Sequence, residues 1–394
     1  MFEVKILQTA DNHLGETAYS RIDASTGLNA RGMDFLSSFK NIVDIAVKKK
    51  VNVLLVVGDF FTRVNPHPRY LLEVMKDLKK LSRANVITIF VSGNHETPKM
   101  VTTVNPLSLL GQIDNVYVFL EPTSIEIDGI DFVCVPAPPL FDEIKDLFNP
   151  LLQLALKNSK SERKILAAHL PLGQASISSE RTLESFIGEC VDAKQISDKF
   201  MYAALGHMHK FQQLKHEGMP IVYSGSSERY EWGEEGDDKF AVLIEIADNV
   251  EISPIKLPVR NMLTIIDQNC SGLSAVKINK LVLEAIGNNK REIKDSLVRI
   301  KLDNIDIDEY RLIDWNIIKQ SLSEYEAFDF KLQPQTVISL PVQAGPRGEY
   351  IFPPSKELEL YVKGKKEYRR IAPQLLKLGN EIIDEAKEMM QSET

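Results

Sequence analysis

At 394 residues, with 44% hydrophobic and 26% charged residues, the chain is long enough for one large folded domain and one or two small ones. No apolar run approaches the roughly 20 residues of a membrane-spanning helix, and the N-terminus lacks the pattern of a secretion signal, so we expect a cytoplasmic protein without a membrane partner. The formal net charge of -8 argues against gripping nucleic acid by bulk positive potential alone. Bound divalent cations would reverse that sign locally, so a polyanionic substrate stays possible.

The first 110 residues alternate between strand and helix. Apolar runs predict strands over 4–10, 51–57 and 85–92, and residues 31–49 and 69–81 between them predict helices. This alternation is typical of parallel strands joined by crossover helices.

After residue 110 the character changes. Residues 124–135 predict a hairpin that turns at Asp128 and Gly129. Short strands with few helices between them follow, as the sequence predicts over 164–170, 200–206, 220–225, 240–246 and 250–257. A mixed sheet, or two packed sheets, with helices outside fits this pattern up to residue 259.

Residues 260–335 read as a second, compact α+β unit of strand, helix, strand, helix and strand. The stretch 336–354 is rich in Pro and Gly and is predicted to be a linker. Residues 355–394 are predicted to form a polar, mostly helical tail. Its apolar residues recur at helical spacing and either pack on the same chain or bind a partner's helices; they are Leu358, Tyr361, Leu375, Leu378, Ile382 and Met389.

The three cysteines predict reduced thiols. Cys134, Cys190 and Cys270 are far apart in the chain, lie among apolar neighbours and form no C-x-x-C pair. Structural thiols rather than disulfides or metal ligands are therefore expected.

Potential metal ligands follow five of the predicted strands. The clearest example is "AALGHMHKF", where a glycine ends an apolar run and two histidines follow, one residue apart. Ligands of open α/β sheets gather beyond the carboxyl ends of strands, so these side chains are expected to share one cleft. Imidazole, carboxylate and amide oxygen together suit Mn²⁺, Zn²⁺ or Fe²⁺ better than Ca²⁺. The candidates are Asp11, His13, Asp59, Asn94, His95, His169, His207 and His209.

The order D-x-H, GD, GNHE, H and GHMH resembles that of the calcineurin-like metallophosphoesterase superfamily. Within it, "TADNHLG", "RGMDFLSSFKNIVDIA" and "VNVLLVVGDFF" look like the DNA double-strand-break nucleases of the SbcD and meiotic-recombination type. The resemblance implies two packed mixed β-sheets flanked by helices over 1–259, a DNA-facing cap domain over 260–335, and a C-terminal tail that binds an SbcC-type coiled-coil ATPase.

The resemblance also implies how the ligands are shared. One metal ion would be bound by Asp11, His13 and His209, the other by Asn94, His169 and His207, with Asp59 bridging. Two ions about 3.5 to 4 Å apart can hold a phosphodiester, activate water and stabilise the charge of the transition state. His95 would stabilise that state and protonate the leaving oxygen. Manganese is the expected metal.

Two positions depart from the nuclease pattern. Thr62 stands where that branch usually has a histidine that positions the DNA phosphate, which puts exonuclease activity in question. His67, five residues later, is a possible replacement, or a solvated loop histidine. Glu96 replaces the more usual aspartate after the GNH motif, a change expected to have little effect.

The sequence therefore predicts a two-metal DNA nuclease that processes broken ends as a homodimer with the ATPase. The family implies 3'-5' exonuclease activity on double strands and endonuclease activity on single strands. Two alternatives remain. One is a phosphoesterase for small nucleotides, which would not need the cap or the tail. The other is a weakly active subunit that recruits the ATPase to DNA, for which Thr62 is the one argument.

Overall fold

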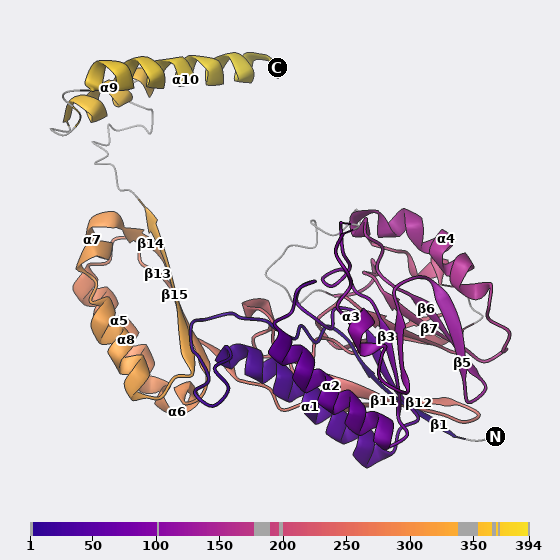
Figure 1. Cartoon of the computed structure of the whole chain (residues 1–394). Coiled ribbons are helices and arrows are strands. Elements are labelled where there is room, and N and C mark those ends of the chain that lie inside the picture. Colours follow the sequence, from indigo (N-terminus) through magenta and orange to yellow (C-terminus); the bar gives the residue numbers. More distant parts are fainter. Residues whose placement is uncertain are drawn as a thin grey trace. The chain divides into compact units, whose positions relative to one another are not determined.

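The computed structural model describes residues 3–100, 102–176, 190–196, 200–337, 354–364, 368 and 371–392. The chain divides into two compact units, Met1–Thr336 and Val337–Thr394 (Figure 1). None of the helices in the described part of the chain combines the length and the apolar character that crossing a membrane requires.

The first sheet of unit one has six strands in the order β12-β11-β1-β2-β3-β4. Four of them are parallel and the hairpin of β11 and β12 adds antiparallel to β1, so the sheet is mixed. The strands are β1 (Val4–Thr9), β2 (Val53–Val57), β3 (Ile87–Val91), β4 (Val116–Phe119), β11 (Phe240–Ile246) and β12 (Val250–Lys256).

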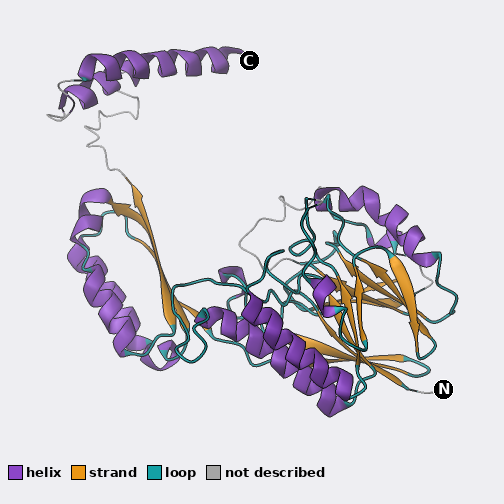
Figure 2. Ribbon diagram, in the orientation of Figure 1, coloured by secondary structure: helices purple, strands orange, loops and turns teal. Residues whose placement is uncertain are grey.

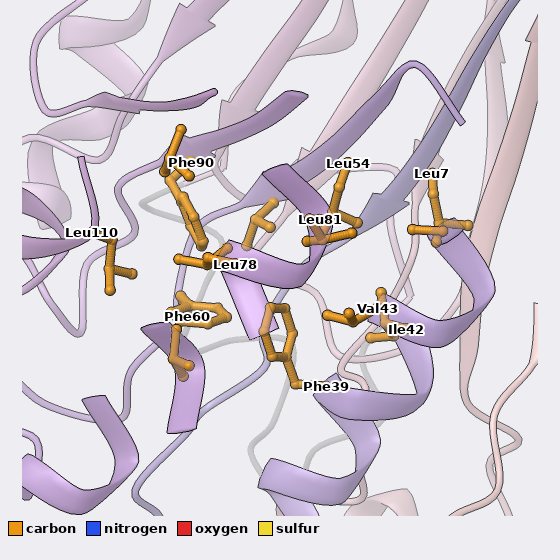
Figure 3. Close-up of a cluster of buried hydrophobic side chains, with 14 of the residues drawn as sticks. Leu7, Phe39, Ile42, Val43, Leu54, Phe60, Leu78, Leu81, Phe90 and Leu110 are labelled. Carbon is orange, nitrogen blue, oxygen red and sulfur yellow. The ribbon is translucent and has the colours of Figure 1, made fainter. Parts of the chain in front are cut away.

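Crossover helices cover one face of this sheet, as the alternating sequence predicts. They are α1 (Ala30–Lys49), α2 (Pro68–Arg83) and the short α3 (Leu107–Leu110). Asn29 caps α1 by accepting a hydrogen bond from the Gly32 amide, and a left-handed Lys50 ends it. Figure 3 shows the apolar side of both long helices, including Phe39 and Leu78, packed on strand residues such as Leu54.

The second sheet also has six strands, in the order β5-β6-β7-β8-β10-β9. The hairpin predicted at Asp128 and Gly129 is confirmed, since both residues have positive φ and join two antiparallel strands. Helix α4 (Ile144–Leu156) packs on the outer face of this sheet. The strands are β5 (Thr123–Ile127), β6 (Ile130–Val135), β7 (Lys164–His169), β8 (Tyr202–Gly206), β9 (Gln212–His216) and β10 (Met219–Tyr223).

The two sheets pack face to face (Figure 2). Their inner faces share one apolar core, in which Ile6, Leu55 and Ile89 from the first sheet meet Phe132 and Ile165 from the second. The predicted architecture of two packed mixed sheets flanked by helices is thereby confirmed. Within the described residues, short 3₁₀ helices in the connections are η1 (Phe141–Glu143), η3 (Ala193–Gln195) and η4 (Trp232–Glu234).

The remainder of unit one is a three-stranded sheet, β13-β14-β15, with helices packed on it. The predicted order of strand, helix, strand, helix and strand is found, except that a second helix follows each predicted one. In the second of these pairs the new helix starts because Asp314 accepts hydrogen bonds from the Asn316 and Ile317 amides. The elements are β13 (Met262–Asn269), α5 (Ala275–Asn288), α6 (Lys290–Ile293), β14 (Leu297–Asp306), α7 (Ile307–Leu312), α8 (Trp315–Glu324) and β15 (Asp329–Val337).

Unit two contains a pair of helices, α9 (Pro354–Gly364) and α10 (Ala372–Ser392). They pack closely: a Cβ added at Gly379 of α10 would lie 2.4 Å from Cδ2 of Leu358 in α9. Of the predicted linker 336–354, residues 338–353 lie outside the described residues.

Candidate metal centre

The predicted ligands come together where strands of both sheets end. Asp11 and Asp59 follow β1 and β2, and Asn94 follows β3 of the first sheet, while His169 ends β7 and His207 follows β8 of the second. Hydrogen bonds tie adjacent ends together, since the Asp11 amide donates to the Gly58 carbonyl at 3.0 Å and the His13 amide to that of Asp59 at 3.0 Å. Packing of the two sheets therefore forms one polar cluster.

Ligand atoms within this cluster form close groups. In each of three sets the candidate donor atoms lie within 4.8 Å of one another; the sets are Asp11, His13 and His209; Asp59, His169 and His207; and His13, Asp59 and His95. The Asn94 Oδ1 atom lies 3.0 Å from His169 Nε2. The structure thus brings all eight candidates into one place.

Backbone and carboxylate acceptors orient three of the imidazoles. His169 Nδ1 lies 3.1 Å from the Val57 carbonyl, His95 Nδ1 lies 3.1 Å from the Thr62 carbonyl, and His209 Nδ1 lies 2.8 Å from Oε1 of Glu234. A carbonyl or carboxylate oxygen only accepts, so each Nδ1 carries the proton. Each Nε2 is then directed to the cluster. In metal-binding histidines a hydrogen bond from the other ring nitrogen orients the imidazole in the same way.

The strand-end glycines make room for the ligands. A Cβ at Gly93 would lie 2.2 Å from Oδ1 of Asp59, and one at Gly58 would lie 2.0 Å from Nδ1 of His169. A Cβ at Gly206 would lie 1.9 Å from the Val57 carbonyl that orients His169. Glycine at these strand ends therefore allows the backbone and the candidate ligands to approach each other closely.

Four of the candidate ligand residues have a left-handed backbone. The φ angles are 49° at Asp11, 46° at His13, 48° at Asp59 and 94° at His207. Such conformations cost free energy outside glycine and persist where the surroundings hold them in place, as they do at functional sites.

Asp59 and His169 form a buried ion pair, with Nε2 3.3 Å from Oδ2. Burial would raise the pKa of Asp59, but the charge of His169 and its hydrogen bond outweigh it and hold that pKa well below its usual range. Burial opposes the charged form of His169 too, yet the Asp59 carboxylate raises its pKa to about 9.

Two of the other candidate ligands, His13 and His207, are neutral imidazoles. Burial, and then the charge of His209, lowers the pKa of His13 well below its usual value, and burial with the charge of His169 lowers that of His207 to about 3. Burial raises the pKa of Asp11 to about 6. Neutral imidazoles and carboxylates are the forms that bind metal ions.

The donor set fits divalent cations. Nε2 of His13 and Nε2 of His209 face each other at 3.1 Å, next to the buried Asp11 carboxylate. Two imidazole nitrogens at that distance can share only one proton, whereas a cation would accept both lone pairs. The other ring nitrogen of His13 is buried and has no hydrogen-bond partner among the described residues.

The predicted catalytic residue, His95, and the residues predicted to position substrate, Thr62 and His67, lie at and beyond the edge of the cluster. The His95 side chain is 37% exposed and its Nε2 lies 3.8 Å from Oδ2 of Asp59. The Thr62 hydroxyl donates to the His13 carbonyl at 2.8 Å. His67 is exposed and caps α2 by accepting from the Arg69 amide, so its described contacts are with its own helix.

Sequence reasoning missed Glu234, Lys239 and Tyr230. The Glu234 side chain is fully buried and binds both His209 and the buried Lys239, and the Tyr230 ring stacks on His13 with centroids 4.3 Å apart. Glu234 is one of several acids in "ERYEWGEEGDD", and no spacing distinguishes it from the other acids of that stretch.

The apolar residues of the tail divide into two groups. Leu358 lies in the contact between α9 and α10, whereas Tyr361, Leu378 and Ile382 are 55%, 57% and 58% exposed. Leu375 is half-buried. Met389 is in α10, but its side chain lies outside the described residues.

A family model described as calcineurin-like phosphoesterase matches residues 4–211. The DNA double-strand break repair protein Mre11 of Saccharolobus solfataricus is 28% identical over 307 residues, 75% of this chain and 74% of that protein. The Mre11 of Sulfurisphaera tokodaii is 27% identical over 84% of each chain, and the SbcD component of the Bacillus subtilis nuclease SbcCD is 26% identical over 61% of this chain and 66% of its own.

Proposed function

Because the chain belongs to the calcineurin-like phosphoesterase family, we propose that it is a two-metal nuclease that hydrolyses phosphodiester bonds of DNA. The cluster of seven candidate ligands and His95 at five strand ends is the observation that carries this proposal. The similarity to Mre11 and SbcD proteins reaches beyond the matched family domain, which supports DNA rather than a small nucleotide as the substrate.

The sets of donor atoms that lie within 4.8 Å of one another suggest how the ligands divide between the two ions. Asp11, His13 and His209 hold one ion, His169, His207 and Asn94 hold the other, and Asp59 bridges. Two ions bound there would bind the phosphodiester, supply an activated water and offset the negative charge of the transition state. We expect Mn²⁺ because the donors mix imidazole with hard oxygen.

His95 acts on the leaving group. Its Nδ1 is held by the Thr62 carbonyl, so Nε2 is the atom that faces the substrate, and the exposed ring can reach it. A proton from Nε2 to the departing sugar oxygen makes that oxygen a better leaving group. In this proposal Thr62 positions His95 through its backbone, while its hydroxyl holds the His13 loop.

The wider proposal is processing of DNA ends in double-strand-break repair, in the cytoplasm, by a homodimer bound to an SbcC-type ATPase. The names of the relatives support the repair role and a multi-subunit nuclease. We assign DNA contacts to residues 260–335, and binding of the ATPase to the exposed side chains of α9 and α10. Double-strand exonuclease and single-strand endonuclease activities belong to the proposal.

Cleavage of end-labelled duplex and single-stranded DNA by the purified chain, with Mn²⁺, Mg²⁺ or EDTA, tests the proposal. Cleavage is expected with Mn²⁺, and both Asp59→Asn and His95→Ala are expected to lower it at least a hundredfold. His216→Ala, a histidine at the end of β9, is the matched control and is expected to keep full activity. Intact DNA beside His95-dependent hydrolysis of a simple phosphodiester would overturn the DNA assignment and leave the metal centre standing.

A further inference from the structure

A buried charged network holds the metal ligand His209 from both sides. Oε1 of Glu234 accepts from His209 Nδ1 at 2.8 Å, and Oε2 accepts from the Ser226 hydroxyl at 2.9 Å and from Lys239. Lys239 also donates to the His209 carbonyl at 3.0 Å. Since Glu234 and Lys239 have almost no exposed surface, they constrain both the ring and the backbone of His209.

Trp232 and Glu235, on either side of Glu234 in the chain, contact the cap, which comprises residues 260–335. Trp232 is 6% exposed and packs with Met262, Leu297 and Phe328. The Arg299 guanidinium of β14 lies 4.7 Å from the centroid of the Trp232 ring.

Glu235, on the other side of Glu234, also binds the cap. Its carboxylate accepts from the Thr264 amide at 2.5 Å and from the Thr264 hydroxyl. Arg299 donates to the same carboxylate, with Nη2 3.3 Å away. Within the segment Trp232–Glu235, the side chains of Trp232 and Glu235 therefore contact the cap. The side chain of Glu234, between them, contacts His209 of the metal centre.

We propose that the segment Trp232–Glu235 couples the cap to the metal centre, with Glu234 as the positioning residue for His209 and Arg299 as its anchor on the cap. This inference rests on the metal centre of the proposed function. Because this segment is short and packed on both sides, a movement of the cap that displaces Trp232 or Glu235 also shifts the Glu234 carboxylate that orients His209. By linkage, a ligand that binds the cap and displaces this segment changes metal affinity, and metal changes the affinity for that ligand by the same factor.

Calorimetric titration of the full-length, metal-free chain with Mn²⁺ tests the coupling without relying on activity. The wild type is expected to bind two ions. Glu234→Gln is expected to weaken one of them by roughly 10 to 100-fold, the usual effect of losing a group that orients a ligand. Arg299→Ala is expected to weaken binding of the same ion roughly fivefold or more, although the contacts described for Arg299 are with Trp232, Thr264 and Glu235.

Lys301→Ala is the matched control. Lys301 lies two residues from Arg299 on the same face of β14 and pairs with Asp267 and Asp303 instead, so its loss is expected to leave both affinities unchanged. Thr264→Val removes the hydroxyl contact with Glu235 and preserves the size of the side chain. It replaces Arg299→Ala as the test if circular dichroism shows that Arg299→Ala is unfolded.

The outcomes separate the two proposals. A wild-type chain that binds no Mn²⁺ removes the metal centre and the proposed function with it. A wild type with two ions whose affinities survive both Arg299→Ala and Thr264→Val overturns the coupling alone, even if Glu234→Gln weakens binding. Loss of affinity in the cap variants, but not in Lys301→Ala, supports the coupling.

Discussion

At Gly206 in β8 the neighbouring strands leave no room for a side chain. Any side chain there would meet the Val57 carbonyl and the Nδ1 of His169, which cannot retreat because both sheets hold them. Gly206→Ala is therefore expected to destabilise the fold by several kcal/mol and to abolish binding of the ion assigned to His169. Urea unfolding and Mn²⁺ titration measure the two effects.

Gly287 is the matched glycine. It lies inside α5 with nothing within 4 Å of an added Cβ. Gly287→Ala is expected to raise the free energy of unfolding by about 0.5 to 1 kcal/mol because alanine favours a helix. If Gly206→Ala were tolerated as well as Gly287→Ala, the close approach described for β8 would be wrong.

Asp77 on α2 is a carboxylate whose charge opposes folding. Burial raises its pKa, and Oδ2 has no hydrogen-bond partner among the described residues. An acid whose pKa is higher in the folded chain contributes stability below its unfolded pKa, about 3.9, and loses that contribution as the pH rises through the folded pKa. At pH 7 the charged form therefore disfavours the fold.

Asp77→Asn is accordingly expected to raise the Tm at pH 7 by roughly 1 to 2 °C, with a smaller gain at pH 4. Differential scanning calorimetry at the two pH values measures it. Asp44→Asn makes the same change of charge at an exposed carboxylate that pairs with Lys80, and no gain is expected there. An equal gain from both variants would point to net charge rather than to burial of Asp77.

At the scale of elements, α10 presents apolar surface that the described part of its own unit does not cover. Leu378→Asp combined with Ile382→Asp is expected to abolish binding of the ATPase coiled coil, because both side chains are more than half exposed. Cleavage of DNA by the chain alone is expected to stay unchanged. Co-elution of the two purified proteins on gel filtration measures the binding.

The control for this pair is Lys377→Ala, an exposed polar change on the same helix. It is expected to keep the complex. Should the double variant still co-elute with the ATPase, the apolar side chains of α10 would not be its docking surface.

For the whole molecule, metal binding and folding are linked. Ions that bind only the folded chain add about 2.7 kcal/mol to its stability at 100 times their Kd, so Mn²⁺ is expected to raise the Tm in a concentration-dependent way and EDTA to lower it again. Asp59→Asn is expected to remove most of this shift, and the exposed Asp248→Asn to keep it. A Tm that ignores Mn²⁺ in the wild type would count against the metal centre.

Local patterns in the sequence determined most of the fold and all eight ligand candidates. Alternating apolar runs predict the strands and crossover helices, and Asp128 with Gly129 predicts its hairpin, because backbone preferences and apolar periodicity act over a few residues. The candidate ligand residues could be recognised because each lies at the end of a strand or within a few residues of it, where neighbouring strand ends meet.

Only the tertiary structure decided what brings those ligands together and what supports them. The packing of two sheets, rather than one, determines which strand ends face each other, and a positive φ at Asp11 or His207 follows from those surroundings and not from residue type. In the sequence Glu234 looks like the other acids of its acidic stretch, and its place behind His209 is set by Lys239 and by the cap packed on Trp232. Contacts between residues far apart in the chain leave no local pattern, which is why the sequence could propose the ligands but not the residues that orient them.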